Sequence, residues 1–441
     1  MNKTDVVIIG AGHNGLTCAA YLAMAGLRVK VVERRKVVGG AAVTEEFCPG
    51  FRNSVAAYTV SLLNPQIISD LKLADHGLRI VERRAQNFLP APDGSHLLTG
   101  EGRTQQSVAK LSPHDAAAIG AFSGELEAIA DVLRQFVLRA PPNLVEGFGI
   151  GAISEVFNAL GTANILRRLS LEQQRNLLDL FTRSAGEMLD ERFDNDLVKA
   201  LFGFDAIVGN YASPYAAGSA YVMLHHAFGE VNGKKGVWGH AIGGMGAITQ
   251  AMARAARSHG VEIETDAPVR EVIVENDRAT GVILDSGETV RAKYVVSNVN
   301  PKLLYTRLVP EGALAGEFRT RISRWQNGSG TFRMNVALSA LPSFTALPGP
   351  GDHLTAGIII APSLGYMDRA WRDAREFGWS RAPVVELLIP STLDDSLSPP
   401  GQHVASLFCQ HVAPQLPGGK SWDDHRDRSE ERRVGKECRS R

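Results

Sequence analysis

The sequence predicts an α/β protein in which a parallel sheet near the N-terminus is joined to a second, mixed sheet and to a helical region. Residues 5–9 form a short run rich in β-branched residues, and a helical pattern follows over residues 16–25. A second strand pattern covers residues 28–33, so a strand, a helix and a strand follow one another. Helical spacing then dominates to about residue 226, and several short strand patterns lie between residues 261 and 298. Alternating strands and helices are typical of parallel sheets with both faces covered.

Length and composition favour a multidomain globular protein that does not bind nucleic acid. The 441 residues are too many for one ordinary core, and the hydrophobic and charged shares are 44% and 21%. Lys plus Arg and Asp plus Glu both number 47, which leaves no excess charge to attract nucleic acid. The first strand pattern begins at Asp5, which leaves no room for a signal peptide, and no apolar run is long enough to span a bilayer. We therefore expect a cytoplasmic location.

The last residues of the chain, 429–441, do not fit the rest of the sequence. They read SEERRVGKECRSR, with eight charged residues and neither apolar periodicity nor a helix cap. The stretch resembles translated vector or adapter sequence, and we expect it not to be native. A solvated, charged C-terminal tail is the alternative interpretation. On the first interpretation the native part ends near Arg428.

Residues 10–15 read GAGHNG and carry the strongest functional signal. Gly10 permits a tight turn after the strand, Gly12 lets the backbone approach a pyrophosphate, and Gly15 lets the helix pack on the strand. The N-terminus of that helix offers free N–H groups and the positive end of its dipole to phosphates. Glu33 ends the second strand at about the spacing expected for an acid that accepts hydrogen bonds from ribose hydroxyls. This order of features predicts a Rossmann-like dinucleotide-binding unit.

A second pair of glycines, Gly39 and Gly40, favours FAD as the dinucleotide. Five residues separate Glu33 from this pair, and the extension resembles that of flavoproteins whose glycine pair passes close to the FAD pyrophosphate. NADP is the alternative, because Arg34 and Arg35 follow the acid, but the carboxylate of Glu33 would repel a 2′-phosphate. We therefore predict an FAD-binding domain. A hairpin pattern that turns at residues 275–278 lies within this domain, as is typical of FAD enzymes of the glutathione-reductase class.

Neither a thiol mechanism nor a metal site is expected. Disulfide reductases carry a redox pair shortly after the glycine pair, where Ala42 and Phe47 stand in this chain, and Cys48 has no partner nearby. His225 and His226 are adjacent, so on a helix their side chains point apart, and no acidic cluster accompanies them. We assign no metal.

Nearly all of residues 1–428 resembles the phytoene-desaturase-like flavoproteins, a family of FAD-dependent oxidoreductases. The resemblance rests on the glycine-rich unit described above, on the motifs YASPY and GSAY, on a longer glycine-rich stretch and on a short GGKSWDD segment. These lie at residues 10–40, 211–215, 218–221, 229–245 and 418–424.

The pattern of elements divides the chain into alternating parts. Two FAD-binding parts are expected at residues 1–61 and 235–300, the second with a hairpin that turns at residues 275–278. A mainly helical substrate or cap region covers residues 62–234, and a substrate-domain sheet covers residues 301–428.

The resemblance also implies roles for individual residues. Val269 should approach the adenine through its backbone, and the turn at Gly243 and Gly244 should approach the flavin ring. His240 begins the residues before this turn, where carotenoid desaturases usually read aromatic-Pro-x, and this departure disfavours a carotenoid substrate. His240 is therefore our candidate general acid or base, and a histidine that merely caps the turn is the alternative. A further flavin-binding segment of the family should follow Asp424 and is not recognisable in this sequence.

The predicted function is the transfer of a hydride from a small or lipophilic substrate to the flavin, with oxygen or a quinone as the electron acceptor. Three alternatives stay open: a flavin-dependent isomerase, an amine oxidase, and a non-catalytic interaction protein stabilised by FAD. Peripheral contact of the helices with a membrane and the oligomeric state also stay open.

Overall fold

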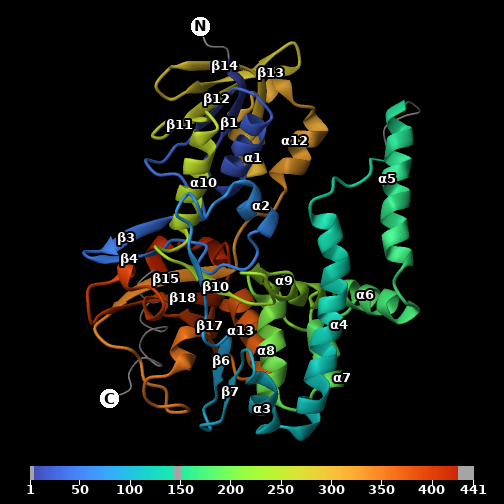
Figure 1. Ribbon diagram of the computed structural model, residues 1–441, viewed down its shortest axis with the longest axis vertical. Helices are drawn as coiled ribbons and strands as arrows, with labels where there is room; N and C mark the ends of the chain where they lie inside the picture. The colour runs from blue at the N-terminus through green and yellow to red at the C-terminus, as the bar shows by residue number, and fades with distance from the viewer. Residues whose placement is uncertain (1–3, 144–149, 426–441) are drawn as a thin grey trace.

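The computed structural model describes residues 4–143 and 150–425, which form two stacked parts, each built around its own sheet (Figure 1). The sheet that holds the N-terminal strand lies at one end of the molecule, and the second sheet lies beneath it beside the helical region. The tail at residues 429–441 lies outside the described residues. The predicted α/β class, with mixed sheets plus helices, is confirmed.

The first sheet has parallel strands at its centre and an antiparallel hairpin at one edge. Its strands, in spatial order, are β11 (Glu262–Glu264), β2 (Val29–Val32), β1 (Thr4–Ile9), β14 (Thr289–Ser297), β13 (Arg278–Leu284) and β12 (Val269–Glu275). β1 is parallel to β2 and β14, whereas β13 is antiparallel to both of its neighbours. Val6 and Ile8 point into one hydrophobic core, and Val7 and Ile9 point into another. The central strand is therefore covered on both faces, as its continuous apolar run predicts.

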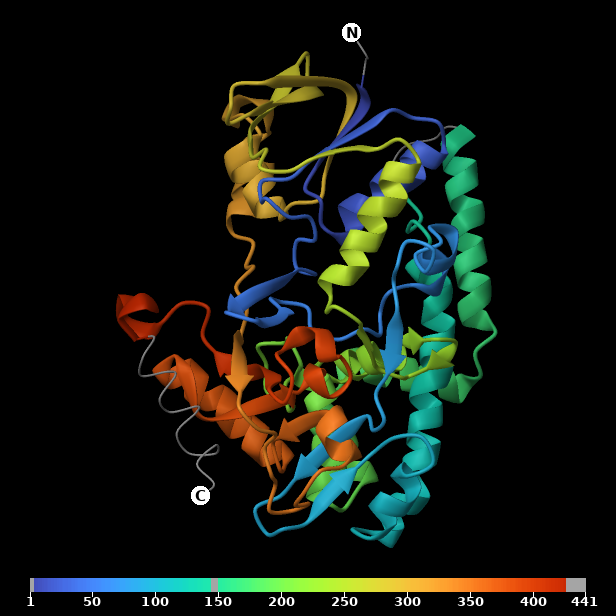
Figure 2. The same ribbon diagram turned by 60° about the vertical axis from the view of Figure 1, so that its left-hand side comes forward.

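Two helices cover one face of this sheet. α1 (His13–Met24) and α10 (Gly246–Ser258) lie side by side there (Figure 2) and bury Leu16 and Ala251 against Ile8. The hairpin at the sheet edge turns where the sequence predicts it, because Asn276 and Asp277 have φ of 51° and 61°. A two-residue hairpin turn of type I′ requires positive φ at both central residues, and Asn and Asp tolerate it.

Residues 301–309 pack against the first sheet, although the sequence pattern assigned them to the second part. α11 (Pro301–Leu303) and the π-helical turn after it bring Leu304 and Leu308 against Val269 and Val295. α12 (Gly316–Ser323) follows on the same side of the molecule (Figures 1 and 2). The boundary near residue 300 is therefore displaced, because these apolar side chains complete the core on that face.

The second sheet is mixed and draws strands from both halves of the chain. Its strands, in spatial order, are β15 (Thr331–Leu338), β18 (His403–Val412), β17 (Trp379–Leu388), β16 (Gly357–Ile360), β6 (Asn87–Pro90) and β7 (His96–Leu98). β6 is parallel to β16, and the other neighbours are antiparallel. β6 and β7 lie in the stretch expected to be mainly helical. The sequence did not predict these two strands, because strands so short show no clear period. α13 (Leu364–Phe377) packs on this sheet.

Three pairs of short strands lie outside the two six-stranded sheets. They are β3 (Thr44–Cys48) with β4 (Phe51–Ser54), β5 (Ile80–Glu82) with β10 (Gly239–Ala241), and β8 (Glu230–Val231) with β9 (Lys234–Lys235).

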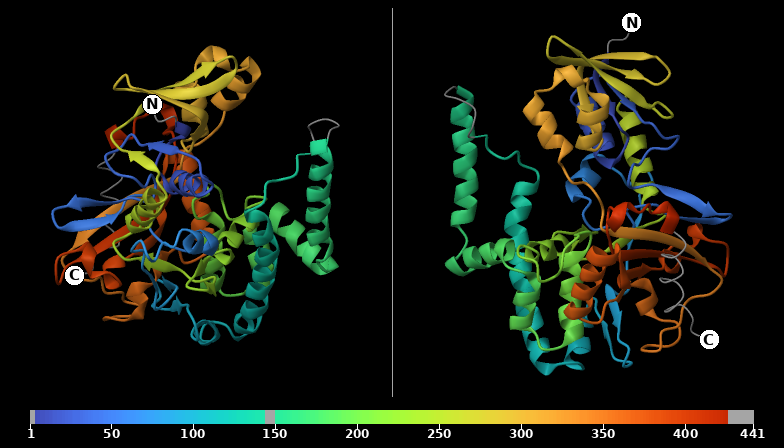
Figure 3. Two further views of the ribbon diagram at one scale, coloured as in Figure 1. Left: turned by 45° about the horizontal axis from the view of Figure 1, so that its top comes forward. Right: turned by 180° about the vertical axis from the view of Figure 1, so that it is seen from behind.

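Helices of the helical region begin at residues typical of helix N-termini, and the region packs around aromatic side chains. Its helices are α3 (Thr104–Ala109), α4 (Pro113–Val137), α5 (Ile150–Arg167), α6 (Leu171–Thr182), α7 (Ala185–Arg192), α8 (Asp196–Ile207) and α9 (Leu224–Ala227). α2 (Pro65–Asp70), which the sequence pattern places in this region, packs with Ile67 and Ile68 against the core of the first sheet. Ser112 caps α4 just before a proline, and Ser170 forms a capping box with Gln173 at α6. α5 stands apart from both sheets (Figure 3). Among the described residues, no helix is both long and apolar enough to cross a bilayer.

We expect the replacement of Phe122 by Ala to lower the free energy of unfolding by about 3–5 kcal/mol. The Phe122 ring is buried and packs edge-on against the rings of Phe193 and Phe202, at centroid distances of 5.4 and 5.0 Å. Urea unfolding followed by circular dichroism measures the change. Leu171→Ala is the control, because its side chain is 84% exposed and should change the free energy by less than about 0.5 kcal/mol. Equal effects of the two substitutions would contradict this account of the helical core.

Candidate functional site

A cavity of 680 Å³ opens at the carboxyl ends of β1 and β2; we call it the strand-end cavity. Ligands of α/β proteins bind at this edge of a sheet, and the volume lies within the range of small-molecule sites. Segments from both expected FAD-binding parts line it, and the residues after β14 add a further wall. The lining residues include Ile9, Gly10, Gly12, His13, Asn14, Val32, Glu33, Arg34, Arg35, Gly40, Ala41, Ala267, Pro268, Val269 and Asn298.

The start of α1 presents unpaired backbone donors to this cavity. Gly10 has φ of +97°, which turns the chain sharply after β1, and Gly12 stands at the N-cap without a side-chain cap. The first N–H groups of the helix therefore have no capping side chain, and they carry the positive end of its dipole. A Cβ atom at Gly12 would lie 3.1 Å from Nδ2 of Asn298, on the wall of the cavity. The strand-to-helix turn thus combines room for a close backbone approach with donors suited to an anion.

The carboxylate of Glu33 is buried at the end of β2 and accepts two backbone hydrogen bonds. The Ala11 N–H donates to Oε2 at 2.8 Å, and the Arg35 N–H donates to Oε1 at 3.0 Å. A carboxylate has about four lone-pair sites, so two stay available to hydroxyl donors in the cavity. The guanidinium of Arg35 pairs with Glu45, so it is already engaged by a carboxylate.

The other predicted glycines of this unit meet one another closely. A Cβ at Gly15 would lie 2.2 Å from the carbonyl oxygen of Gly10, so α1 can lie against the end of β1 only if residue 15 has no side chain. The Gly39 N–H donates to the carbonyl of Ala11 at 2.8 Å, and Gly40 has φ of +58° and approaches Gly12. Gly40 lines the cavity, whereas Gly15 and Gly39 lie behind its wall.

The turn at Gly243 and Gly244 packs against β3 and β4. Both glycines have positive φ, and a Cβ at Gly244 would collide with the side chain of Thr44. The N–H groups of Met245 and Gly246 donate to the hydroxyls of Ser54 and Thr44, at 3.0 and 2.9 Å. Neither glycine is among the residues that line the strand-end cavity.

His240 lies on β10 with its side chain 8% exposed, and it forms a pair with Asp394. Its Nε2 is 3.0 Å from Oδ2 of Asp394, and the same oxygen accepts the N–H of Gly243 at 2.7 Å. Burial raises the pKa of Asp394, but hydrogen bonds from His240, Ser396 and Gly243 outweigh it and lower the pKa to about 2. The pair therefore ties the strand before the glycine turn to the loop that holds Asp394.

A second cavity of 320 Å³ lies beside the first; we call it the Tyr58 cavity. The two are neighbours, because Ala57 lines the Tyr58 cavity and its N–H donates to the carbonyl of Ala41, which lines the other, at 2.9 Å. Sequence reasoning missed this cavity, since it is built from several separate segments. Its lining consists of Ala57, Tyr58, Thr59, Ser61, Leu62, Arg83, Asn87, Phe204, Val208, Gly209, His225, His226, Trp238, Glu386 and Phe408.

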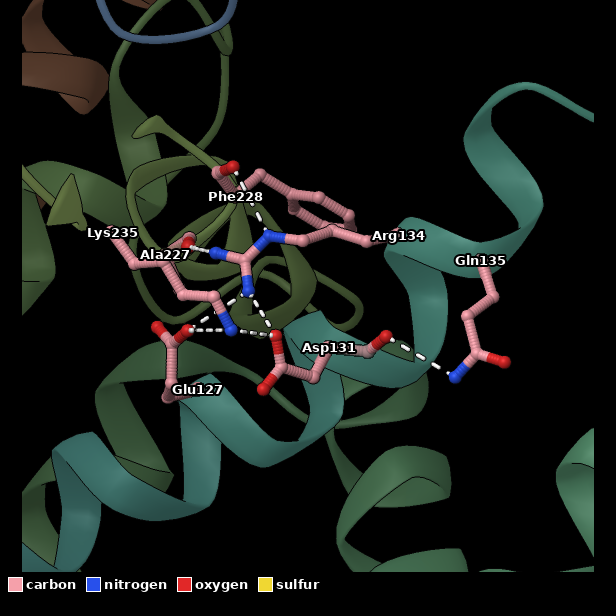
Figure 4. Close-up of polar contacts among 7 residues, drawn as sticks. All are labelled: Glu127, Asp131, Arg134, Gln135, Ala227, Phe228 and Lys235. Carbon is pink, nitrogen blue, oxygen red and sulfur yellow. Dashed lines mark hydrogen bonds and ion pairs between the residues drawn. The ribbon is translucent and has the colours of Figure 1, made fainter. Parts of the chain in front are cut away.

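Charged residues on α4 contact the segment that follows two histidines of the Tyr58 cavity (Figure 4). Arg134 donates to the carbonyls of Ala227 and Phe228, just after the two histidines that line the cavity. Asp131 of the same helix pairs with Arg134 and, at 2.6 Å, with Nζ of Lys235. These contacts tie residues 225–238 to α4 from both sides.

His114, Asp115 and Asp194 also bring potential metal-ligand atoms together. Both carboxylate oxygens of Asp115 accept backbone N–H groups, those of Asp194 and Asn195. The carboxylate of Asp115 therefore has a structural role, because it binds the backbone at the start of α8.

Comparison with known proteins identifies relatives over most of the chain. A family model described as flavin containing amine oxidoreductase matches residues 15–331. Two proteins named pyridine nucleotide-disulfide oxidoreductase domain-containing protein 2, from Rattus norvegicus and Mus musculus, are each 37% identical. The matches cover 96% and 95% of this chain and 76% and 75% of theirs. A 4,4'-diaponeurosporene oxygenase from Staphylococcus aureus is 25% identical over 69% of this chain and 57% of its own.

Solved structures share the fold. An oxidoreductase from Methanosarcina mazei has a TM-score of 0.58 at 17% identity, covering 98% of this chain and 83% of its own. A triple mutant of putrescine oxidase has a TM-score of 0.57 at 19% identity, covering 98% and 79%.

Replacing Asp394 with Asn should lower the free energy of unfolding at neutral pH by about 2 kcal/mol, because Asn lacks the charge that His240 and Gly243 stabilise. The pKa of Asp394 is lowered from 3.8 to about 2 in the folded chain. Its contribution is therefore complete above pH 3.8 and is lost as the pH falls toward 2. Urea midpoints at a series of pH values should show the difference from the native chain shrinking over this window.

The matched control for this experiment is Asp395→Asn, because Asp395 is the neighbouring residue and is exposed. Its effect should be within about 0.5 kcal/mol at every pH. A difference for Asp394→Asn that does not change between pH 3.8 and 2 would contradict the assigned role of the charge.

Proposed function

This chain belongs to the family of flavin-containing amine oxidoreductases, and from that premise we propose which of its two cavities binds the cofactor and which binds the substrate. The chain is an FAD-dependent oxidoreductase, and its substrate is a small molecule. We infer that the strand-end cavity holds FAD and that the Tyr58 cavity holds the substrate.

The placement of FAD rests on one observation: five of the nine residues that the sequence predicts for FAD binding line a single cavity, and they are Gly10, Gly12, Glu33, Gly40 and Val269. The N–H groups at the start of α1, with Gly12 and Gly40, would hold the pyrophosphate. Glu33 would accept hydrogen bonds from the ribose, and the backbone of Val269 would face the adenine. The residues thus fit the group in charge, hydrogen-bonding capacity and space. This arrangement favours a nucleotide domain of the glutathione-reductase class.

The flavin end of the cofactor would lie toward Ala41, where the strand-end cavity adjoins the Tyr58 cavity. Bound FAD supplies the capacity to accept a hydride equivalent from a substrate C–H bond. The residues of the chain supply the rest: Phe204, Val208 and Trp238 exclude water, and the polar groups beside them orient the substrate. Oxygen or a quinone as electron acceptor, a cytoplasmic location and peripheral membrane contact stay predictions.

For His240 we propose a positioning role in place of acid–base catalysis. Its ring is buried and engaged by Asp394, whose other hydrogen bonds hold the Gly243 turn. Such a histidine shapes the backbone on which Gly243 and Gly244 would approach the flavin. The polar groups nearest the proposed substrate belong instead to the Tyr58 cavity.

Substituting Val for Gly12 should weaken FAD binding at least about tenfold, because the added side chain would occupy the space that the pyrophosphate needs. Released FAD per chain, together with titration of FAD into the stripped protein, measures the effect. Gly120→Ala is the control, because Gly120 lies within α4 with no atom within 4 Å of an added Cβ. It should leave FAD content unchanged. An unchanged FAD affinity of a folded Gly12→Val chain would contradict the proposed site.

The reaction class is tested by anaerobic mixing of the flavin-loaded protein with amines, alcohols and apolar carboxylic acids. We expect one of these classes to bleach the oxidised flavin and oxygen or a quinone to restore it. Product formation without any electron acceptor would instead indicate an isomerase. Equal turnover by the Gly12→Val chain stripped of FAD would contradict the proposal.

A further inference from the structure

Two arginines lie around the Tyr58 cavity; Arg83 is buried and Arg333 is half-buried. Arg83 lines the cavity, is 8% exposed, and donates from Nη2 to the hydroxyl of Thr59 at 2.6 Å. The guanidinium carbon of Arg333 lies 4.2 Å from the centre of the Tyr58 ring, and its Nη2 donates to Ser406 at 2.6 Å. Nε and Nη1 of Arg333 are buried with no hydrogen-bond partner. Among the described residues, neither guanidinium forms an ion pair, and Glu386 acts on both from a longer distance.

The other ionisable groups around the cavity do not balance these two charges. Glu386 supplies one negative charge and accepts a hydrogen bond from the Tyr58 hydroxyl at 2.5 Å. His226 and Asp205 lie 3.2 Å apart. Burial, together with the Glu386 carboxylate, raises the pKa of Asp205 well above its usual value, and burial lowers the pKa of His226 well below its usual value, so both are neutral. Burial, together with the Glu386 carboxylate, raises the pKa of Tyr58 well above its usual value, and burial lowers the pKa of His225, so both are neutral. The region therefore carries one positive charge in excess.

An unbalanced buried charge is costly unless a ligand of opposite sign balances it. The remaining walls are apolar or aromatic, with Leu62, Phe204, Val208 and Phe408 among them. We propose that the Tyr58 cavity binds a small organic carboxylate with an apolar body, and that Arg83 is the residue that binds its carboxylate. This inference deepens the proposed function, on which it rests for the identity of the cavity as the substrate chamber.

The sign and the size of the excess charge select a carboxylate over other polar head groups. A protonated amine would add a second unbalanced positive charge to the cavity. A phosphate monoester carries nearly two negative charges at neutral pH and would overcompensate. A carboxylate carries one, and its two oxygens match the planar fork of a guanidinium.

The test is isothermal titration of the full chain, loaded with FAD, with four probes that share one alkyl chain: octanoate, octylamine, octan-1-ol and octyl phosphate. We expect octanoate to bind at least about tenfold more tightly than octylamine or octan-1-ol. Octylamine or octyl phosphate binding as tightly as octanoate, or no detectable octanoate binding, would overturn the inference.

Three variants assign the binding to Arg83 and to the charge balance. Arg83→Met should weaken octanoate binding by about 10- to 100-fold and leave octan-1-ol within about twofold, whereas Arg83→Lys should restore part of the loss. Glu386→Gln keeps an acceptor for the Tyr58 hydroxyl while removing the negative charge, so it should tighten octanoate binding. A misfolded variant cannot produce such a gain. Unchanged octanoate affinity in Arg83→Met, or weaker binding in Glu386→Gln, would overturn the inference.

FAD content separates failure of this inference from failure of the proposed function. Full FAD loading with no preference for octanoate removes the carboxylate site and leaves the FAD placement standing. Selective octanoate binding by a chain that holds no FAD removes the FAD placement and leaves the carboxylate site standing.

Discussion

The close packing of backbone turns at the carboxyl end of β1 is the constraint on which the cofactor half of the molecule depends. A side chain at Gly15 would collide with the carbonyl of Gly10, and a Cβ at Gly40 would lie 3.2 Å from Cα of Gly12. The carboxylate of Glu33, at the end of the neighbouring strand, binds the N–H of Ala11 in the middle of these turns. β1, α1 and the pair Gly39 and Gly40 therefore fix one another's positions. The start of α1 faces the strand-end cavity, and its first backbone N–H groups are unpaired.

The charge around the Tyr58 cavity bears on which substrate the cavity accepts. The region around Tyr58 holds two guanidiniums and the carboxylate of Glu386. The excess positive charge would therefore repel a cationic substrate. Apolar walls next to these charges favour an amphipathic ligand. The fold is shared with putrescine oxidase, but the charge of the chamber is a property of individual side chains, and function follows the site more closely than the fold.

His240 illustrates how position in the sequence and position in space can differ. It stands next to a glycine turn, which made it our candidate acid or base, yet its ring is buried and held by Asp394. Asp394 is distant in sequence and has no motif around it, so only the assembled structure reveals the pair. The polar groups that line the Tyr58 cavity, such as those of Arg83 and Tyr58, belong to no recognisable sequence pattern.

The sequence by itself determined the features that arise between residues a few positions apart. The strand–turn–helix–strand unit, the glycines that admit no side chain and the hairpin turn at Asn276 and Asp277 follow from local backbone preferences. The tertiary structure alone decided the Tyr58 cavity, the return of residues 301–309 to the first sheet, and the entry of β6 and β7 into the second. Arg83 and Arg333 are far apart in the chain, and their charges add only because the fold brings both beside Tyr58. The charge and the shape of a cavity depend on residues from distant segments, so no local sequence pattern predicts them.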